Sequence, residues 1–192
     1  MPKRCEWSTT DAMQNYHDTV WGIPVHDDRL LFEFVCLESA QAGLSWATIL
    51  AKRENYKKAF DNFDVNAIAS YDQAKIDKLL GDPGIVRNRL KVASVVTNAR
   101  AVLAIQKEFG SFDTFIWGFV EHRPIQNKWQ NISEVPAQTD ISTRMSTTLK
   151  KRGFKFIGAG ICYSFMQAVG MVNDHTLDCF RHDEIEALSR SR

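Results

Sequence analysis

The sequence has little net charge and contains no long hydrophobic run. Its 192 residues include 24 Lys and Arg and 23 Asp and Glu, so the formal net charge is +1. Because the surface is not basic as a whole, any contact with nucleic acid must come from local patches. The most apolar stretch, 157–172, is interrupted by Gly158, Gly160, Gln167 and Gly170 and falls short of the roughly 18 to 20 apolar residues that a membrane span needs. We interpret this stretch as a buried core helix.

The amino-terminal segment 1–7 also lacks an apolar stretch, so we expect no signal peptide. The sequence contains no internal repeat or low-complexity tract. A chain of this length with 44% hydrophobic residues can bury one core. We therefore expect a single soluble, cytoplasmic domain over residues 1–192, with a monomer as the simplest state.

The alternation of apolar and polar residues that marks a strand is absent, whereas apolar residues recur with helical spacing almost everywhere. We therefore predict an all-α fold. Ser45, Asp64 and Asp72 are expected N-caps, and Gly110 is expected to end the longest helix. The predicted helices cover residues 30–38, 46–60, 65–70, 73–80, 86–108, 113–120, 141–151 and 158–172. The stretch 121–140 is the one long connection without a predicted element.

One connection between predicted helices, Leu79-Leu-Gly-Asp-Pro-Gly-Ile-Val-Arg87, turns tightly at Gly81 and Gly84. It resembles a helix-hairpin-helix, in which the backbone N–H groups that open the second helix bind one phosphate. Arg87, Arg89 and Lys91 follow directly and are candidates to hold neighbouring phosphates. Glycine-rich turns between helices are common, so an ordinary turn remains the alternative.

Near the amino terminus, the aromatic residues Tyr16, Trp21 and Trp46 accompany one carboxylate, Glu38. A flat, electron-poor ligand needs aromatic faces for stacking and an acceptor to orient it, and a damaged, positively charged nucleobase is such a ligand. The alternative for both tryptophans is packing in the core, and the alternative for Glu38 is an exposed position at a helix end. Because Glu38 follows a mostly apolar run, we predict that it is buried or lies in a cleft, where a carboxylate needs partners.

Several segments resemble the 3-methyladenine DNA glycosylase I family of the helix-hairpin-helix superfamily. The similarity runs from Cys5 to Cys179, and the segments that carry it are Tyr16-His-Asp-Thr-Val-Trp-Gly-Ile-Pro24, Gln41-Ala-Gly-Leu-Ser-Trp46, Lys150-Lys-Arg-Gly-Phe-Lys-Phe156, Ile161-Cys-Tyr-Ser-Phe-Met-Gln167 and Val172-Asn-Asp-His175. The resemblance implies an enzyme that flips N3-methyladenine out of alkylated double-stranded DNA and excises it by hydrolysis. A protein that binds the damaged base without cutting remains the alternative.

The resemblance also implies the site residues. Glu38 is expected to be the essential catalytic residue, acting more as a recogniser than as a general base. The base pocket is expected to consist of Glu38 together with Trp7, Tyr16, Trp21, Gln41 and Trp46. No lysine occurs among these residues, so we expect no strand cleavage through a Schiff base. Many enzymes of the superfamily use an aspartate beyond the hairpin to support the sugar cation, and the sequence contains no clear candidate.

Two further groups are candidates for DNA contact. Gly43 and Leu44 are expected to contact DNA, and Leu44 resembles the wedge that fills the gap left in the duplex, with core packing of Leu44 as the alternative. The densest basic cluster contains Lys150, Lys151, Arg152 and Lys155. If this cluster binds DNA, it should share one face with the pocket mouth and with the arginines of the hairpin; a solvated surface is the alternative.

Two cysteines and two histidines near the chain ends, Cys5, His17, His175 and Cys179, make a donor set suited to zinc. Their spacing alone is also compatible with ordinary surface or core residues, and a disulfide between the two cysteines is possible in principle. The resemblance implies one structural zinc that joins residues 1–28 to 173–180, with 181–192 as a flexible tail. A zinc-dependent hydrolase would instead need an open coordination position.

The remaining cysteines and histidines fit no pattern. Cys36 and Cys162 lie in apolar stretches and are expected to act as small hydrophobic residues, whereas His26, His122 and His182 are expected on the solvated surface. The sequence departs from the family pattern at residues 11–16, where Met13 replaces an aromatic residue. Because sulfur is a weaker partner for a cation than an aromatic face, this change bears on substrate range.

Overall fold

The computed structural model describes residues 2–190. The described chain is mostly helical and forms one domain, as the sequence predicts. Besides its helices, it contains three short 3-10 segments, η1 (Asp61–Phe63), η2 (Gly118–Val120) and η3 (Ile132–Glu134). It also contains two short strands, β1 (Ile125–Gln126) and β2 (Val172–Asn173). The helices are α1 (Asp11–Thr19), α2 (Asp28–Gln41), α3 (Trp46–Ala59), α4 (Val65–Ala69), α5 (Gln73–Leu80), α6 (Arg89–Phe109), α7 (Phe112–Trp117), α8 (Asp140–Lys151), α9 (Ala159–Ala168) and α10 (Arg181–Arg190).

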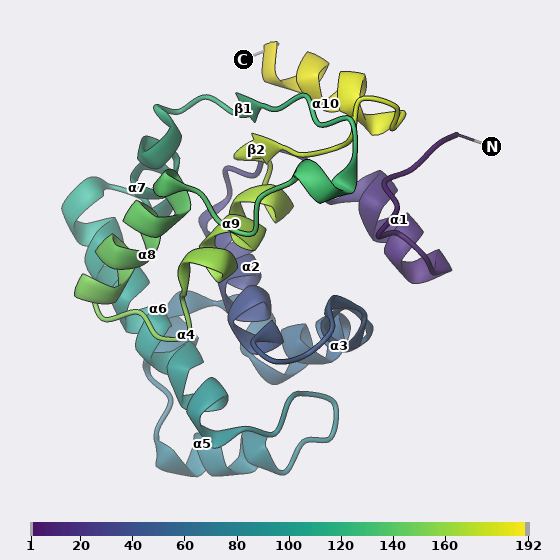
Figure 1. The fold of residues 1–192 in the computed structure, drawn as a ribbon. Coiled ribbons are helices and arrows are strands. Elements are labelled where there is room, and N and C mark those ends of the chain that lie inside the picture. Colours follow the sequence, from purple (N-terminus) through teal and green to yellow (C-terminus); the bar gives the residue numbers. More distant parts are fainter. Residues whose placement is uncertain (1, 191–192) are drawn as a thin grey trace.

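Helix α2 is the centre of the fold, with α3, α6, α7 and α9 packed around it (Figure 1). All residues from 31 to 40 are buried, so this helix is enclosed on every side and not only along one stripe. Asp27 caps its start by accepting a hydrogen bond from the Leu30 amide. Two carboxyl groups are buried on this helix: Glu33 pairs with Arg53, at 2.6 Å, and Glu38 faces a cavity. The central helix therefore carries a charge-bearing side chain into the interior near its carboxyl end.

Most predicted helix boundaries are confirmed. Ser45, Asp64 and Asp72 each accept a hydrogen bond from an amide in the first turn of the following helix. The longest helix ends at Gly110, whose φ of 87° lies in the region that favours glycine. Its start was predicted three residues too early, because Asn88 caps the helix and residues 86–88 belong to the turn before it.

Five elements differ from the predictions. Helix α1 is short and polar and was not predicted, and the helix expected over 158–172 covers only 159–168. Strands β1 and β2 pair in parallel over two residues each, which is too short for an alternating pattern to show. Residues 181–190, expected as part of a flexible tail, form α10 with a fully buried Ile185. The rest of that expected tail, 191–192, lies outside the described residues.

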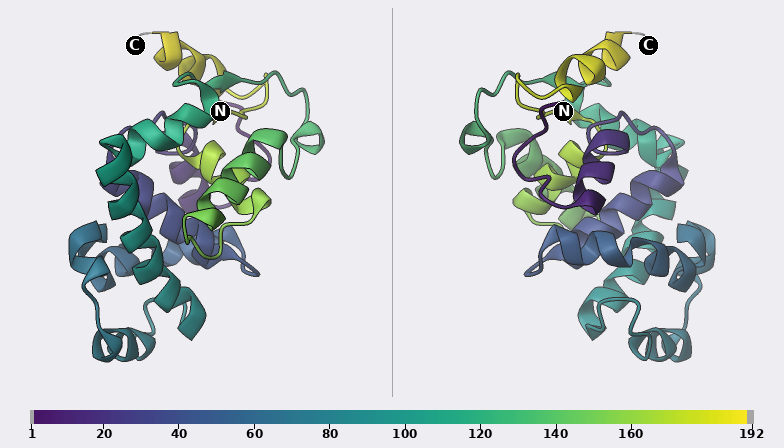
Figure 2. Two further views of the ribbon diagram at one scale, coloured as in Figure 1. Left: turned by 90° about the vertical axis from the view of Figure 1, so that its left-hand side faces the viewer. Right: turned by 90° about the vertical axis from the view of Figure 1, so that its right-hand side faces the viewer.

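The two ends of the described chain lie in the same part of the molecule (Figures 1 and 2). The Phe180 amide donates to the carbonyl of Lys3, at 3.0 Å, so the amino-terminal segment contacts the residue that directly precedes α10. Residues 22–24 also cross Gly170 closely: a Cβ at this glycine would lie 2.5 Å from the nitrogen of Pro24. None of the helices in residues 2–190 is long and apolar enough to cross a membrane.

Candidate active site and metal centre

A cavity of about 260 Å³ opens between α1, α2, α3 and α9. The structure brings all six predicted pocket residues together around it. Five further residues line the same cavity, and the sequence had assigned a role to only one of them, Met13. The full lining consists of Trp7, Met13, Tyr16, Trp21, Glu38, Gln41, Trp46, Ile132, Ser164, Gln167 and Asp174.

Four aromatic rings form two pairs along the cavity wall. The centroids of Trp7 and Trp21 are 5.0 Å apart with an interplanar angle of 70°, and those of Tyr16 and Trp46 are 5.3 Å apart at 49°. Tyr16 and Trp21 are buried, whereas Trp7 and Trp46 are partly exposed. The arrangement gives a flat ligand several aromatic surfaces to contact.

Three polar atoms of the lining residues are buried and have no hydrogen-bond partner within residues 2–190. They are the hydroxyl of Tyr16, Oε2 of Glu38 and the indole nitrogen of Trp46. A buried polar atom without a partner costs roughly 1 to 3 kcal/mol, so native structures contain few of them. Their concentration at one cavity indicates a site for a ligand with hydrogen-bonding groups.

The protonation of Glu38 follows from its surroundings. Its side chain is 3% exposed, and burial raises its pKa from 4.5 to about 8. Burial also raises the pKa of Tyr16 well above its usual value, with the Glu38 carboxyl adding to the effect. At neutral pH the Glu38 carboxyl group is therefore mostly neutral. A cationic ligand beside it favours the ionised form and lowers that pKa.

Asp174, on the α9 and β2 side of the cavity, is a buried carboxyl group for which the sequence predicts no role. One of its oxygens accepts hydrogen bonds from Asn127 Nδ2 and Trp129 Nε1, at 2.7 and 2.8 Å. The other accepts from Tyr163 Oη and Gln167 Nε2, also at 2.7 and 2.8 Å. Asp174 lies within the family motif 172–175, of which the sequence analysis assigns a role only to His175. Asp174 joins α9, β2 and the 127–129 segment into one wall.

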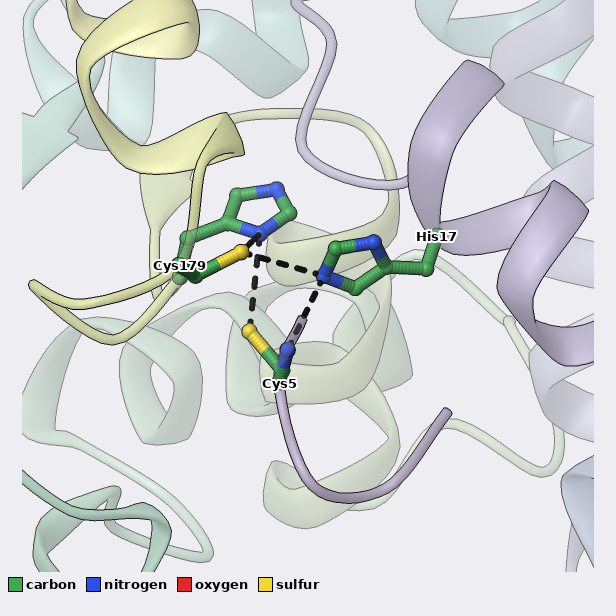
Figure 3. A group of neighbouring side chains, drawn as sticks. Cys5, His17 and Cys179 are labelled. Atoms are coloured by element: carbon green, nitrogen blue, oxygen red, sulfur yellow. Dashed lines mark hydrogen bonds between the residues drawn. The ribbon is translucent and has the colours of Figure 1, made fainter. Parts of the chain in front are cut away.

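The four predicted metal ligands lie together and are all buried. Cys179 Sγ is 3.4 Å from both His17 Nε2 and His175 Nδ1, and Cys5 Sγ is 3.5 Å from His175 Nδ1. Figure 3 shows Cys5, His17 and Cys179 directed toward one another. In a tetrahedral site with Zn–S near 2.3 Å and Zn–N near 2.0 Å, sulfur and nitrogen are about 3.5 Å apart. The donor atoms therefore have the spacing of a four-coordinate metal centre.

Further contacts orient the two histidines. His17 Nδ1 lies 2.8 Å from Asp18 Oδ1, and Arg4 forms a forked ion pair with the same aspartate. His175 Nε2 lies 3.3 Å from the backbone oxygen of Trp21. A carboxylate or carbonyl behind the imidazole is the usual support of a metal-bound histidine. The same rings contact the pocket wall, because the centroid of His175 is 4.6 Å from that of Trp21.

The predicted hairpin is formed by α5, the turn 81–88 and α6. Gly84 is required by close packing, because a Cβ there would lie 3.0 Å from Cβ of Asn55 on α3. Arg87 and Arg89 are exposed at this turn, and Arg89 pairs with Asp77 at 2.9 Å. On the neighbouring loop 42–45, Leu44 is 40% exposed, so the core alternative for this residue is wrong.

Comparison with known proteins decides the family. The model of the methyladenine glycosylase family matches residues 7–182. The chain is 46% identical to DNA-3-methyladenine glycosylase 1 of Escherichia coli (strain K12) over 178 residues, which cover 92% of this chain and 95% of that protein. The chain belongs to the methyladenine glycosylase family.

Solved structures of relatives agree with this assignment. A crystal structure of 3-methyladenine DNA glycosylase I superposes with a TM-score of 0.92 at 46% identity, covering 94% of this chain and 100% of the other. A variant of 3-methyladenine DNA glycosylase I in complex with 3-methyladenine superposes with a TM-score of 0.90 at 38% identity, covering 92% and 96%.

The basic cluster at 150–155 is divided in this methyladenine glycosylase. Arg152 forms a two-point ion pair with Glu108, at 2.7 and 3.0 Å, and lies over the ring of Phe109. These partners are at the carboxyl end of α6, whereas Arg89 is at its amino end. Lys155, by contrast, lines a surface hollow together with Leu90, near the hairpin. Lys155 is thus placed near the arginines of the hairpin, whereas Arg152 is bound at the other end of α6.

Other predictions about cysteine and histidine have mixed outcomes. Cys36 and Cys162 are buried in helices, as expected. His182 is 3% exposed, so its predicted surface position is wrong. Helix α10 packs this ring back onto the chain, where Nε2 lies 3.0 Å from the carbonyl oxygen of Asn127. His26 keeps an exposed position but stacks on Trp117, with ring centroids 4.3 Å apart.

Proposed function

We propose that this protein is a DNA glycosylase that removes N3-methyladenine from alkylated double-stranded DNA by hydrolysis, without cutting the strand. The observation that carries the proposal is the group of unpartnered polar atoms around the aromatic cavity, with Glu38 at its centre. Membership of the methyladenine glycosylase family supports the same reaction. A base must leave the duplex to reach such a cavity, so base flipping is part of the proposal.

Selective binding explains most of the proposed chemistry. Alkylation at N3 makes adenine cationic and weakens its bond to deoxyribose, and the departing base becomes neutral. Each aromatic face favours a cation by roughly 0.5 to 2 kcal/mol. Ionised Glu38 adds a charge-assisted hydrogen bond of roughly 1.5 to 3 kcal/mol from the edge of the base. An unmodified adenine is neutral and gains less from both contributions, while its glycosidic bond stays strong.

We propose zinc as the metal held by the four-residue cluster. Two thiolates and two imidazoles are the donor set of structural zinc sites, and four protein ligands occupy a tetrahedral ion completely. The ion would cross-link the two ends of the chain behind Trp21. We therefore assign the hydrolytic water to the cavity and not to the metal.

The proposed DNA interface combines the hairpin with the 42–45 loop. Leu44 is an exposed apolar residue beside the cavity and has the character of a wedge between bases. Gly43 has a φ of 79°, which a residue with a side chain adopts at a cost. The amides of Arg89 and Leu90 at the start of α6, with Arg87 beside them, suit a backbone phosphate. We propose that a monomer makes all these contacts.

Chromatography of the bases released from methylated duplex DNA tests the proposal. We expect free 3-methyladenine with little 7-methylguanine, and intact strands afterwards. Glu38→Ala should bind the same DNA with similar affinity and release base roughly 10- to 150-fold more slowly, since it loses a charge-assisted contact of roughly 1.5 to 3 kcal/mol to the reacting base. Tight binding of methylated DNA by the unmodified protein without any released base would instead establish the non-catalytic, damage-binding alternative.

A further inference from the structure

Lys91 makes an unusual contact between the hairpin and the helix that carries Glu38. It lies in the first turn of α6, and its ammonium group donates to the backbone oxygens of Ala40 and Ala42, at 2.8 and 2.6 Å. Ala40 is in the last turn of α2, and Ala42 is the C-cap of that helix. The sequence had placed Lys91 among candidates for phosphate contact. In the structure this side chain points to the end of α2 instead.

The charge of Lys91 suits α2 and not its own helix. The carboxyl end of a helix is partly negative and leaves backbone oxygens without partners, whereas the amino end is partly positive. The last turn of α2 contains no basic residue of its own, and the first turn of α6 contains no acidic one. A lysine near the start of α6 is therefore unfavourable for α6 and supplies the missing positive charge to α2.

Helix α3, which follows the loop 42–45, is also hydrogen-bonded to the hairpin. Lys52 on α3 donates to the Pro83 carbonyl at 2.8 Å, and the Val86 amide donates to the Tyr56 hydroxyl at 3.2 Å. The loop 42–45 connects α2 to α3, so the hairpin is bonded to the elements on both sides of it. Lys91 is the contact nearest to the loop, because Ala42 is the first residue of the loop.

We propose that Lys91 is a positioning residue that fixes the 42–45 loop and the end of α2 to the hairpin. Leu44 and Glu38 then keep a set position relative to the phosphates bound at the hairpin. The part of this inference that concerns DNA rests on the proposed function. The alternative role for Lys91, direct contact with a phosphate, predicts different behaviour in salt.

Hydrogen exchange of the protein without DNA tests the contact independently of any activity. Lys91→Met keeps the length of the side chain and removes its donors. We expect the amides of residues 40–44, including that of Leu44 which donates to the Gln41 oxygen at 2.6 Å, to exchange on the order of tenfold faster. Lys58→Met, on the exposed side of α3, is the matched control and should leave these rates unchanged. Equal rates in Lys91→Met and the unmodified protein would overturn the proposal.

Kinetics on methylated DNA test the consequence. Lys91→Met should lower the rate of base release at saturating DNA on the order of 10- to 100-fold, because small misplacements of a reacting group have effects of this size. The slope of log affinity against log salt concentration should stay unchanged, whereas Arg87→Gln should reduce its magnitude by about 0.9. A reduction of about 0.9 in Lys91→Met would make Lys91 a phosphate contact. If the unmodified protein releases no base, the proposed function fails, and hydrogen exchange alone decides the role of Lys91.

Discussion

The two walls of the cavity each contain a buried carboxyl group, and the two groups have opposite surroundings. Oε2 of Glu38, on the α2 wall, has no hydrogen-bond partner within the described chain. Asp174, on the wall of α9 and β2, accepts four hydrogen bonds from side chains of two segments, 127–129 and α9. Glu38 thus has bonding capacity left for a ligand, whereas Asp174 uses its own to hold the protein together. Lining a cavity is not enough to assign a carboxyl group to ligand binding.

The candidate metal cluster adjoins the second wall through His175. His175 follows Asp174 directly in the chain, and its ring contacts Trp21. The cavity therefore has one wall that is held by hydrogen bonds beside a cluster able to hold a metal ion, and one wall whose Glu38 carboxyl has an unpartnered oxygen. Binding sites commonly retain such locally unfavourable groups, and the surrounding structure stabilises them.

The largest expected effect comes from breaking the four-residue cluster that we propose as the metal site. Cys179→Ser should lower the free energy of unfolding by about 4 kcal/mol or more and remove the bound metal, because a structural ion contributes directly to folding. Elemental analysis together with thermal unfolding measures both effects. Cys162→Ser changes a buried cysteine outside the cluster and should keep the metal. Full zinc occupancy in Cys179→Ser would refute the ligand assignment.

Glu38→Gln tests the wall that contains the unpartnered Glu38 carboxyl, and it should raise stability while lowering activity. The folded pKa of about 8 lies above the unfolded value of 4.5, so the folded state holds its proton more tightly. The contribution of this group to the free energy of unfolding therefore falls as pH rises from about 4.5 to about 8. Because glutamine does not titrate, the variant should be more stable at pH 7 by about 3 kcal/mol at most, and by little near pH 4.5.

Thermal unfolding across this pH range measures the gain, with base release followed in parallel. Release should fall together with the rise in stability, since the ligand loses its ionised partner. A variant that is less stable than the unmodified protein at pH 7 would contradict the assignment of Glu38 as an unsatisfied group.

Asp174→Asn should destabilise the protein, in contrast to Glu38→Gln. An amide in place of the carboxylate directs its own N–H groups at donors, so at least one hydrogen bond becomes a repulsive contact. We expect the free energy of unfolding to fall by about 2 kcal/mol, within the range for a buried group left unsatisfied. Chemical denaturation of the two carboxyl variants side by side makes the measurement. Equal effects of Asp174→Asn and Glu38→Gln would remove the distinction between the walls.

The sequence predicted the helices that have caps or regular apolar spacing, such as those begun by Ser45 and Asp72. It missed α1 and α10 because both are short and mostly polar, so their stability comes from contacts with distant segments. The resemblance supplied Glu38 and the aromatic residues. The role of Asp174 could not be predicted from spacing, because its donors come from residues 127, 129, 163 and 167.

The smallest expected effect concerns Met13, where the aromatic lining is interrupted. This residue lines the cavity and is partly buried, and the hydroxyl of Thr9 lies 3.9 Å from its sulfur. Met13→Tyr would add an aromatic face to the α1 side of the cavity, which is worth roughly 0.5 to 2 kcal/mol toward a cation. We expect KM for methylated DNA to fall by about 2- to 30-fold, with little change in stability.

The same variant distinguishes how the two kinds of contact act. Glu38 is expected to act on the cationic base through a hydrogen bond as well as through charge, whereas the ring at position 13 would act through its face alone. Met13→Tyr in the Glu38→Gln background should therefore still improve binding of the cationic base. If the gain disappears in that background, the aromatic face and the carboxylate act as one unit, and a double-mutant cycle gives the size of their coupling.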